Sequence, residues 1–194
     1  NLRYVDYLIG DSYKFSGQFT QLDTINNLTF TSKDHVDRPS YFSYFPKLKH
    51  IENFLAIKGY LTEVTTPKFT TGSNFSLTLA SDIDSTTLKI LSDRIKKENL
   101  KTFTIFPGNN INLKYLPILD SVENLHFSYC GNNDFSYISN IKKVRNLTLG
   151  NDLGNNDYGE GLKYIEELNT LFTHNNKYSL GYKTILPNLK SINR

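Results

Sequence analysis

The sequence has no methionine, no tryptophan and a single cysteine, Cys130, among its 194 residues. One thiol excludes an intramolecular disulfide framework, and it favours an intracellular location, cytoplasmic or nuclear, with a secreted or surface-attached protein as the alternative. Alanine is scarce, since Ala56 and Ala80 are the two examples, and this argues against a helical bundle because alanine is the best helix former. No run of about 18 apolar residues occurs, so the sequence predicts no transmembrane helix.

An excess of one charge is also lacking. The 22 lysines and arginines against 19 aspartates and glutamates give a net charge of +3, which is too small for the electrostatic footprint of a nucleic-acid-binding protein. Hydrophobic residues make up 38% and charged residues 21%, as in an ordinary globular domain. Because the chain lacks methionine and starts at Asn1, we expect a fragment of a longer protein.

What the sequence does contain is a repeat. The frame apolar-x-x-Leu-x-apolar occurs at Ile25–Phe30, Val122–Phe127 and Val144–Leu149, and in varied or looser form elsewhere along the chain. Its central position steps through residues 28, 55, 77, 103, 125, 147, 171 and 192, at intervals of 27, 22, 26, 22, 22, 24 and 21 residues. A fixed period of 20 to 50 residues is the sequence signature of a solenoid or a related repeat architecture.

This frame and period resemble the leucine-rich repeat family over about residues 22–194. The resemblance implies an α/β solenoid with a curved parallel β-sheet on its concave face, and with helices, 3₁₀ turns and loops on its convex face. The asparagine that the family carries at its ninth position is matched only by Asn176, so the array is irregular. The other repeats carry different residues at that position: Lys33, Asp82, Gly108, Cys130 and Asp152.

The domain organisation follows from this period. We expect one domain over residues 1–194, in which 1–21 form a degenerate repeat or an amino-terminal cap and 22–194 form about eight repeats. The longer intervals predict extra structure. We expect a helix over 86–98, capped by Asp84 or Ser85 and ended by Asn99, and an insertion around the aromatic residues 41–45 packed on the core.

No set of residues predicts catalysis, a cofactor or a metal site, and we expect a protein that is not an enzyme. The four histidines are dispersed, and His126 and His174, two repeats apart, would lie about 10 Å from each other, too far to share a metal. Cys130 is interpreted as a small buried residue, and the glycine-rich segment 150–161 as a turn-rich connection rather than a calcium loop. Sequons begin at Asn27, Asn74 and Asn146, matches that chance explains in a sequence this rich in asparagine.

Binding is predicted on the concave face. Side chains alternate along a strand, so the residues between the inward leucines point outward and form a neutral, hydrogen-bonding surface with a few phenylalanines. We expect a protein or peptide partner there, with no nucleic acid, membrane or small-molecule substrate. The candidate partner-binding residues are Phe54, Lys58, Thr104, Phe106, Asn124, His126, Asn146, Thr148, Phe172 and His174.

Three functions from different classes stay open at this point. The chain is predicted to be a non-catalytic protein-interaction module of an intracellular protein. It could instead be the substrate-recognition segment of a multi-domain ubiquitin-ligase-type protein, or a secreted or surface recognition domain. What lies outside these residues would separate the three.

Overall fold

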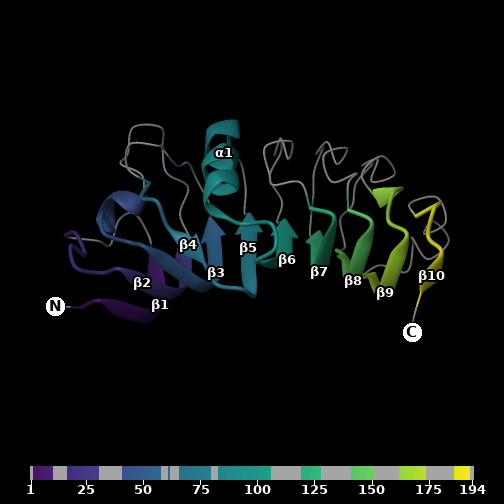
Figure 1. The fold of residues 1–194 in the computed structure, drawn as a ribbon, viewed down its shortest axis with the longest axis horizontal. Helices are drawn as coiled ribbons and strands as arrows, with labels where there is room; N and C mark the ends of the chain where they lie inside the picture. Colours follow the sequence, from purple (N-terminus) through teal and green to yellow (C-terminus); the bar gives the residue numbers. More distant parts are fainter. Residues whose placement is uncertain are drawn as a thin grey trace.

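The computed structural model describes residues 2–10, 17–30, 41–57, 61, 66–79, 83–105, 119–127, 141–150, 162–173 and 186–192. Strands dominate these ranges, and the helix α1 and the 3₁₀ helix η1 accompany them (Figure 1). In chain order the elements are β1 (Tyr4–Gly10), β2 (Thr24–Phe30), η1 (Tyr41–Tyr44), β3 (His50–Ile57), β4 (Thr70–Thr71), β5 (Phe75–Leu79), α1 (Ser85–Arg94), β6 (Leu100–Ile105), β7 (Ser121–Phe127), β8 (Lys143–Leu149), β9 (Glu167–Thr173) and β10 (Ser191–Ile192).

The strands form one parallel sheet whose spatial order follows the chain, β1-β2-β3-β5-β6-β7-β8-β9-β10, with the short β4 beside β3. Since every pair is parallel, the chain must travel back after each strand before it forms the next. One strand together with its return path is called a coil here. Stacked coils of this kind make a solenoid, with few helices among the described residues (Figure 1).

Seven of the eight predicted strand centres are confirmed. The eighth, residue 192, is wrong, because Ile192 of β10 lies opposite Leu168 rather than Leu171. Seven residues lie opposite one another in neighbouring strands: Leu28, Leu55, Leu77, Phe103, Leu125, Leu147 and Leu171. Leu8 of β1 continues this row, because it is the register partner of Leu28. The predicted burial of Leu125 and Leu147 is also confirmed, with exposed fractions of 1% and 0%. Each coil buries its apolar residues against its neighbours, which is why the sequence forms these strands.

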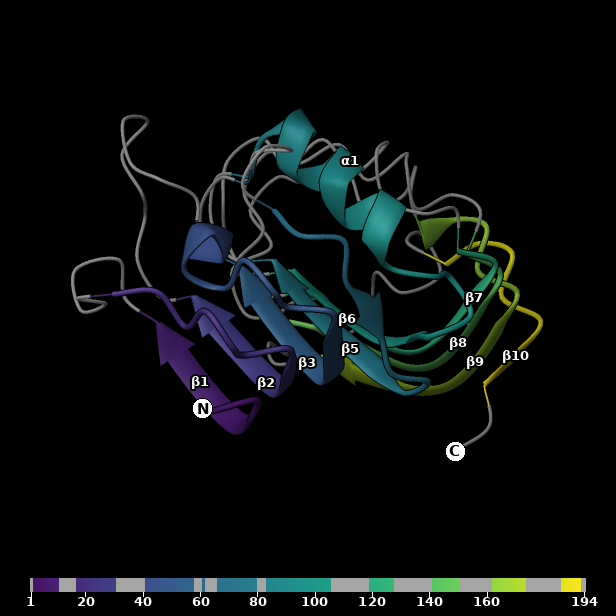
Figure 2. The same ribbon diagram turned by 60° about the vertical axis from the view of Figure 1, so that its left-hand side comes forward.

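Helix α1 lies on one side of the sheet, above β3 and β5 in the view of Figure 1, and Figure 2 shows it on the same side. It begins at Ser85 because the Asp84 side chain caps it, accepting a hydrogen bond from the Thr87 backbone N–H at 2.7 Å. Its inward side includes the buried side chains of Thr87, Leu88, Ile90 and Leu91.

The predicted end of this helix, at Asn99, is wrong. The helix ends at Arg94, and Ile95 adopts an extended backbone with φ −97° and ψ 116°. Ile95 is 2% exposed, so the chain turns there to bury its side chain. Asn99 lies in the turn into β6, and its side-chain amide donates to the Thr71 carbonyl at 3.0 Å.

The aromatic insertion packs on the core, as predicted. Phe42 and Phe45, in and just after η1, are fully buried. Phe42 stacks on Phe69 with ring centroids 5.4 Å apart, and it meets the edge of Phe30 at the same distance. Phe45 stacks on Phe19 at 5.5 Å. These ring contacts join coils on both sides of the insertion.

A turn of one form leads into several strands, and the sequence analysis did not identify it. The fourth residue of the turn donates its backbone N–H to the carbonyl of the first, as in Leu48 to Phe45 at 3.1 Å and Leu189 to Leu186 at 3.2 Å. Proline occupies the second position in both cases, where its fixed φ suits a turn. The residue after such a turn uses its carbonyl to join one coil to the next. Asp23 follows the turn in which Leu22 N–H donates to Phe19 C=O, and its own carbonyl accepts from both Lys49 N–H and His50 N–H.

Candidate binding surface

The side of the sheet opposite α1 is not covered by any helix or strand within the described ranges (Figure 2). We call this side the open face. Two rows of side chains run across it, and the register of the strands defines them. The first row is Ile9, Thr29, Ala56, Thr78, Thr104, His126, Thr148 and Phe172. The second row is Tyr7, Asn27, Phe54, Ser76, Thr102, Asn124, Asn146 and Thr170.

The first row has little-exposed side chains in its middle and an exposed apolar side chain at each end. Ala56 and Thr78 are each only 8% exposed, so they form a floor rather than projecting groups. Ile9 is 71% exposed at one end, and Phe172 is 54% exposed at the other. Mostly short side chains therefore lie between two exposed apolar groups, with His126 the largest residue among them.

Seven of the ten predicted binding residues are described, and all seven lie in these two rows. Phe172 is exposed and the other six are half-buried: Phe54, Thr104, Asn124, His126, Asn146 and Thr148. The remaining three, Lys58, Phe106 and His174, lie outside the described residues, as do Cys130 and most of the glycine-rich segment after Gly150.

Two of these residues are already hydrogen-bonded to each other. Asn146 donates its side-chain amide to Asn124 Oδ1 at 2.7 Å, and Asn124 donates to Thr102 Oγ1 at 3.0 Å. A second chain of amides lies near β1, where Asn53 donates to Asn26 and Asn26 donates to Asp6, both at 2.6 Å. Asn124 and Asn146 therefore hold neighbouring strands together, in addition to any role toward a partner.

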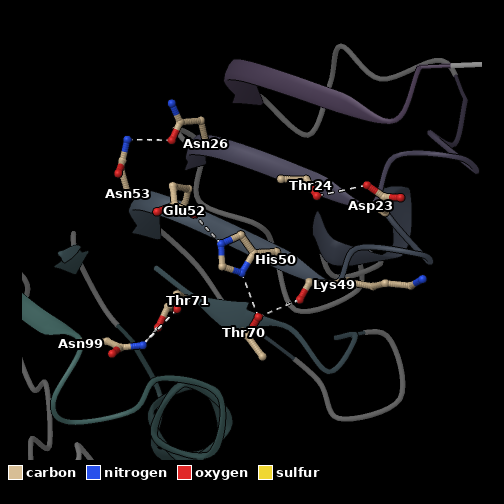
Figure 3. Close-up of polar contacts among 10 residues, drawn as sticks. All are labelled: Asp23, Thr24, Asn26, Lys49, His50, Glu52, Asn53, Thr70, Thr71 and Asn99. Atoms are coloured by element: carbon tan, nitrogen blue, oxygen red, sulfur yellow. Dashed lines mark hydrogen bonds and ion pairs between the residues drawn. The ribbon is translucent and has the colours of Figure 1, made fainter. Parts of the chain in front are cut away.

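A third polar cluster centres on His50, at the start of β3 (Figure 3). The ring lies between two side chains: Nδ1 is 2.8 Å from Thr70 Oγ1, and Nε2 is 2.7 Å from Glu52 Oε2. Thr70 Oγ1 also lies 3.3 Å from the Lys49 carbonyl, to which it donates. The sequence analysis did not identify this cluster, because Thr70 follows His50 by a long return path.

A hydroxyl, an imidazole and a carboxylate in this order resemble the groups that activate a nucleophile. Acyl transfer also needs N–H donors aimed at the developing oxyanion. The nearby backbone donors are used elsewhere: Thr70 N–H donates to Lys49 C=O at 2.9 Å, and Gly72 N–H donates to Ile51 C=O at 3.1 Å. The cluster therefore fits a structural role, in which its hydrogen bonds hold the two-residue strand β4 against β3.

A charged hollow of about 360 Å³ lies at the beginning of strands β6 to β9. Four basic and three acidic side chains line it, so the two signs nearly balance: Lys97, Lys101, Lys143 and Arg145 against Glu98, Glu123 and Glu167. Lys143 Nζ lies 2.8 Å from Glu167 Oε1, and this hydrogen bond and charge raise the pKa of Lys143. Because positive and negative charges nearly balance in this hollow, it favours the binding of neither a polyanion nor a polycation.

Other classes of site were sought in the same part of the chain. No group of three or more histidine, cysteine, aspartate or glutamate side chains that could hold a metal occurs in the described ranges. None of the helices described there is long and apolar enough to cross a membrane.

Comparison with known proteins gives no relative. No family model matches the chain, and searches of curated proteins and of solved structures find no match. The likeness to leucine-rich repeats therefore depends on the period of the sequence and on the parallel solenoid.

Proposed function

We propose that this chain is a non-catalytic protein-interaction module of the leucine-rich-repeat type, which binds a protein or peptide across its open face. The observation that carries the proposal is Phe172. It is a large apolar side chain, 54% exposed, at one end of a row whose middle consists mostly of short side chains. Exposed aromatic groups surrounded by short hydrogen-bonding residues are typical of the anchors of protein interfaces.

The size of the face supports a macromolecular partner. The first row crosses eight strands, and at about 4.8 Å per strand it extends over roughly 34 Å. A specific protein interface needs about 800 Å² from each side, which a surface of this length supplies. Phe54, half-buried in the second row between Asn27 and Ser76, adds a second aromatic contact on the same face.

The proposal is tested by photocrosslinking in the cell of origin. A photoreactive phenylalanine analogue at position 172 should capture a specific partner, and the same group at position 96, an exposed residue after α1, should not. Once the partner is known, Phe172→Ala should weaken its affinity by about 30-fold or more, because buried aromatic anchors carry over 2 kcal/mol. Lys96→Ala is the matched control and should leave the affinity unchanged. The opposite pattern, in which Lys96→Ala weakens binding and Phe172→Ala does not, would move the function away from the open face.

A further inference from the structure

Strand β1 is the edge of the sheet, and its exposed surface is unusually apolar. In the described residues it is hydrogen-bonded to β2 only. Four of the six large hydrophobic side chains that are exposed in the described structure lie in or beside it. They are Leu2, Tyr4, Tyr7 and Ile9, with exposed fractions of 54%, 53%, 71% and 71%.

The core is also incomplete at this edge. Val5 and Leu8 are only partly buried, whereas Ile25 and Leu28, their register partners in β2, are fully buried. One more strand beside β1 would bury Val5 and Leu8 as β1 buries their counterparts.

The usual protections of an edge strand are lacking here. Natural edge strands are blunted by charges, by proline or by bulges. The segment Tyr4–Gly10 holds no proline, and its one charged residue, Asp6, already accepts a hydrogen bond from Asn26 at 2.6 Å. β1 is also seven residues long, enough for a stable pairing.

We propose that β1 pairs antiparallel with β1 of a second copy of this chain, so that two solenoids form a symmetric dimer with one continuous sheet. The five residues of β1 from Asp6 to Gly10 are self-complementary. A twofold axis at Leu8 places Leu8 of one copy against Leu8 of the other on the core side. It places Tyr7 opposite Ile9 on the open face, and Asp6 opposite Gly10, so the two carboxylates do not meet.

The exposed area is sufficient for a dimer. The four apolar side chains leave on the order of 500 Å² in solvent, near the upper end of the largest apolar patch of a typical monomer. With Val5 and Leu8, each copy approaches the roughly 800 Å² that one subunit contributes to a standard interface.

The symmetry of this pairing explains why the assembly closes at two copies. Head-to-tail stacking of β1 on β10 would extend without limit, whereas pairing of β1 with β1 uses the same surface on both copies and ends there.

The proposal is tested by the mass of the unmodified protein in solution. Sedimentation velocity over about 1 to 100 µM should show a monomer that gives way to a dimer as the concentration rises. Ile9→Lys should raise the dissociation constant at least tenfold, because it places a charge in the paired edge without touching the core. Phe172→Lys, which changes another exposed apolar position at the far end of the sheet, is the control and should dimerise normally.

A crosslink then tests the arrangement of the two strands. In a Cys130→Ser background, which leaves no other thiol, Leu8→Cys should form a disulfide-linked dimer on mild oxidation, since directly opposed residues bring their Cα atoms to about 5 Å. Thr148→Cys, far from β1, should not. A protein that stays monomeric at all concentrations, or a dimer that is insensitive to Ile9→Lys and not linked through position 8, would overturn the proposal. Neither result would bear on partner binding at Phe172.

Discussion

At the scale of single residues, Leu147 shows how tightly the coils pack. It is fully buried in β8, between Leu125 of β7 and Leu171 of β9. Leu147→Ala should lower the free energy of unfolding by about 2–5 kcal/mol, through lost burial and the cavity left behind. Urea denaturation followed by circular dichroism measures the change. Thr148→Ala, the next residue on the open face, should cost under about 1 kcal/mol, and a similarly small loss for Leu147→Ala would mean that the inward register is wrong.

The ladder of Asn124, Asn146 and Thr102 is a second property of individual side chains. The Asn146 amide donates to Asn124 across one strand gap, and both groups are part-buried. Asn124→Ala should destabilise the protein by about 1–2 kcal/mol, because it removes the acceptor of one bond and the donor of another.

A double-mutant cycle isolates this contact. Asn124→Ala and Asn146→Ala together should cost less than the sum of the two single changes, with a coupling of about 0.5–1 kcal/mol. Strict additivity in urea denaturation would show that the amide contact adds nothing to stability.

At the scale of elements, the strands could be predicted and their connections could not. The frame apolar-x-x-Leu-x-apolar specifies which residues face inward, so the row from Leu28 to Leu171 follows from spacing alone. The end of α1 depends on tertiary packing, since Ile95 leaves the helix to bury its side chain, and helix propensity carries no such information. Strand β4 depends on the path of a return segment, which periodicity does not specify.

The open face was predictable to the same extent. Alternation along a strand places Phe54, Asn124 and Phe172 outside, and the structure has all three there. The alternation of side chains does not indicate which outward residues form hydrogen bonds with one another, so the amide ladder and the His50 cluster were not predicted. One irregularity of the register could be predicted from the sequence. Ile51 and Leu55 in β3 are four residues apart instead of three, and the register between β2 and β3 shifts accordingly.

Another element-scale property is the pH dependence of the last strand. Lys190, just before β10, forms an ion pair with Glu166, just before β9, and this hydrogen bond and charge hold the pKa of Glu166 below its ordinary value. A lowered folded pKa contributes stability that is present above the unfolded pKa and is lost as the pH falls through the folded one. The protection factors of the amides at Lys190–Ile192, which correct for the intrinsic pH dependence of exchange, should therefore fall at acid pH, below the ordinary range of a glutamate. Lys190→Ala should already have low protection factors at neutral pH, and equal pH profiles of protection for the two proteins would contradict the link.

At the scale of the whole molecule, stability should be graded along the stack. Central strands are hydrogen-bonded on both sides, whereas β1 and β10 have one neighbour each among the described elements. Backbone amides of β6 to β8 should exchange at least tenfold more slowly than those of β10, because the end coils open without disturbing the centre. Hydrogen exchange with mass spectrometry, at a concentration where the protein is monomeric, measures this gradient. Uniform exchange along the chain would show that the solenoid unfolds as a single unit.

The hydrogen bonds that join each coil to the next also determine how the molecule would respond to a pulling force. The Asp23 carbonyl holds the start of the following coil, and Lys142 C=O holds Glu166 N–H and Glu167 N–H in the same way. Strands contact mainly their immediate neighbours, so tension applied at the two ends would pass through these joints in series. The weakest joint would yield first, and each released coil of about 22 residues would lengthen the chain by roughly 70–80 Å. A stack built in this way behaves as an extensible tether, which lengthens in steps under load.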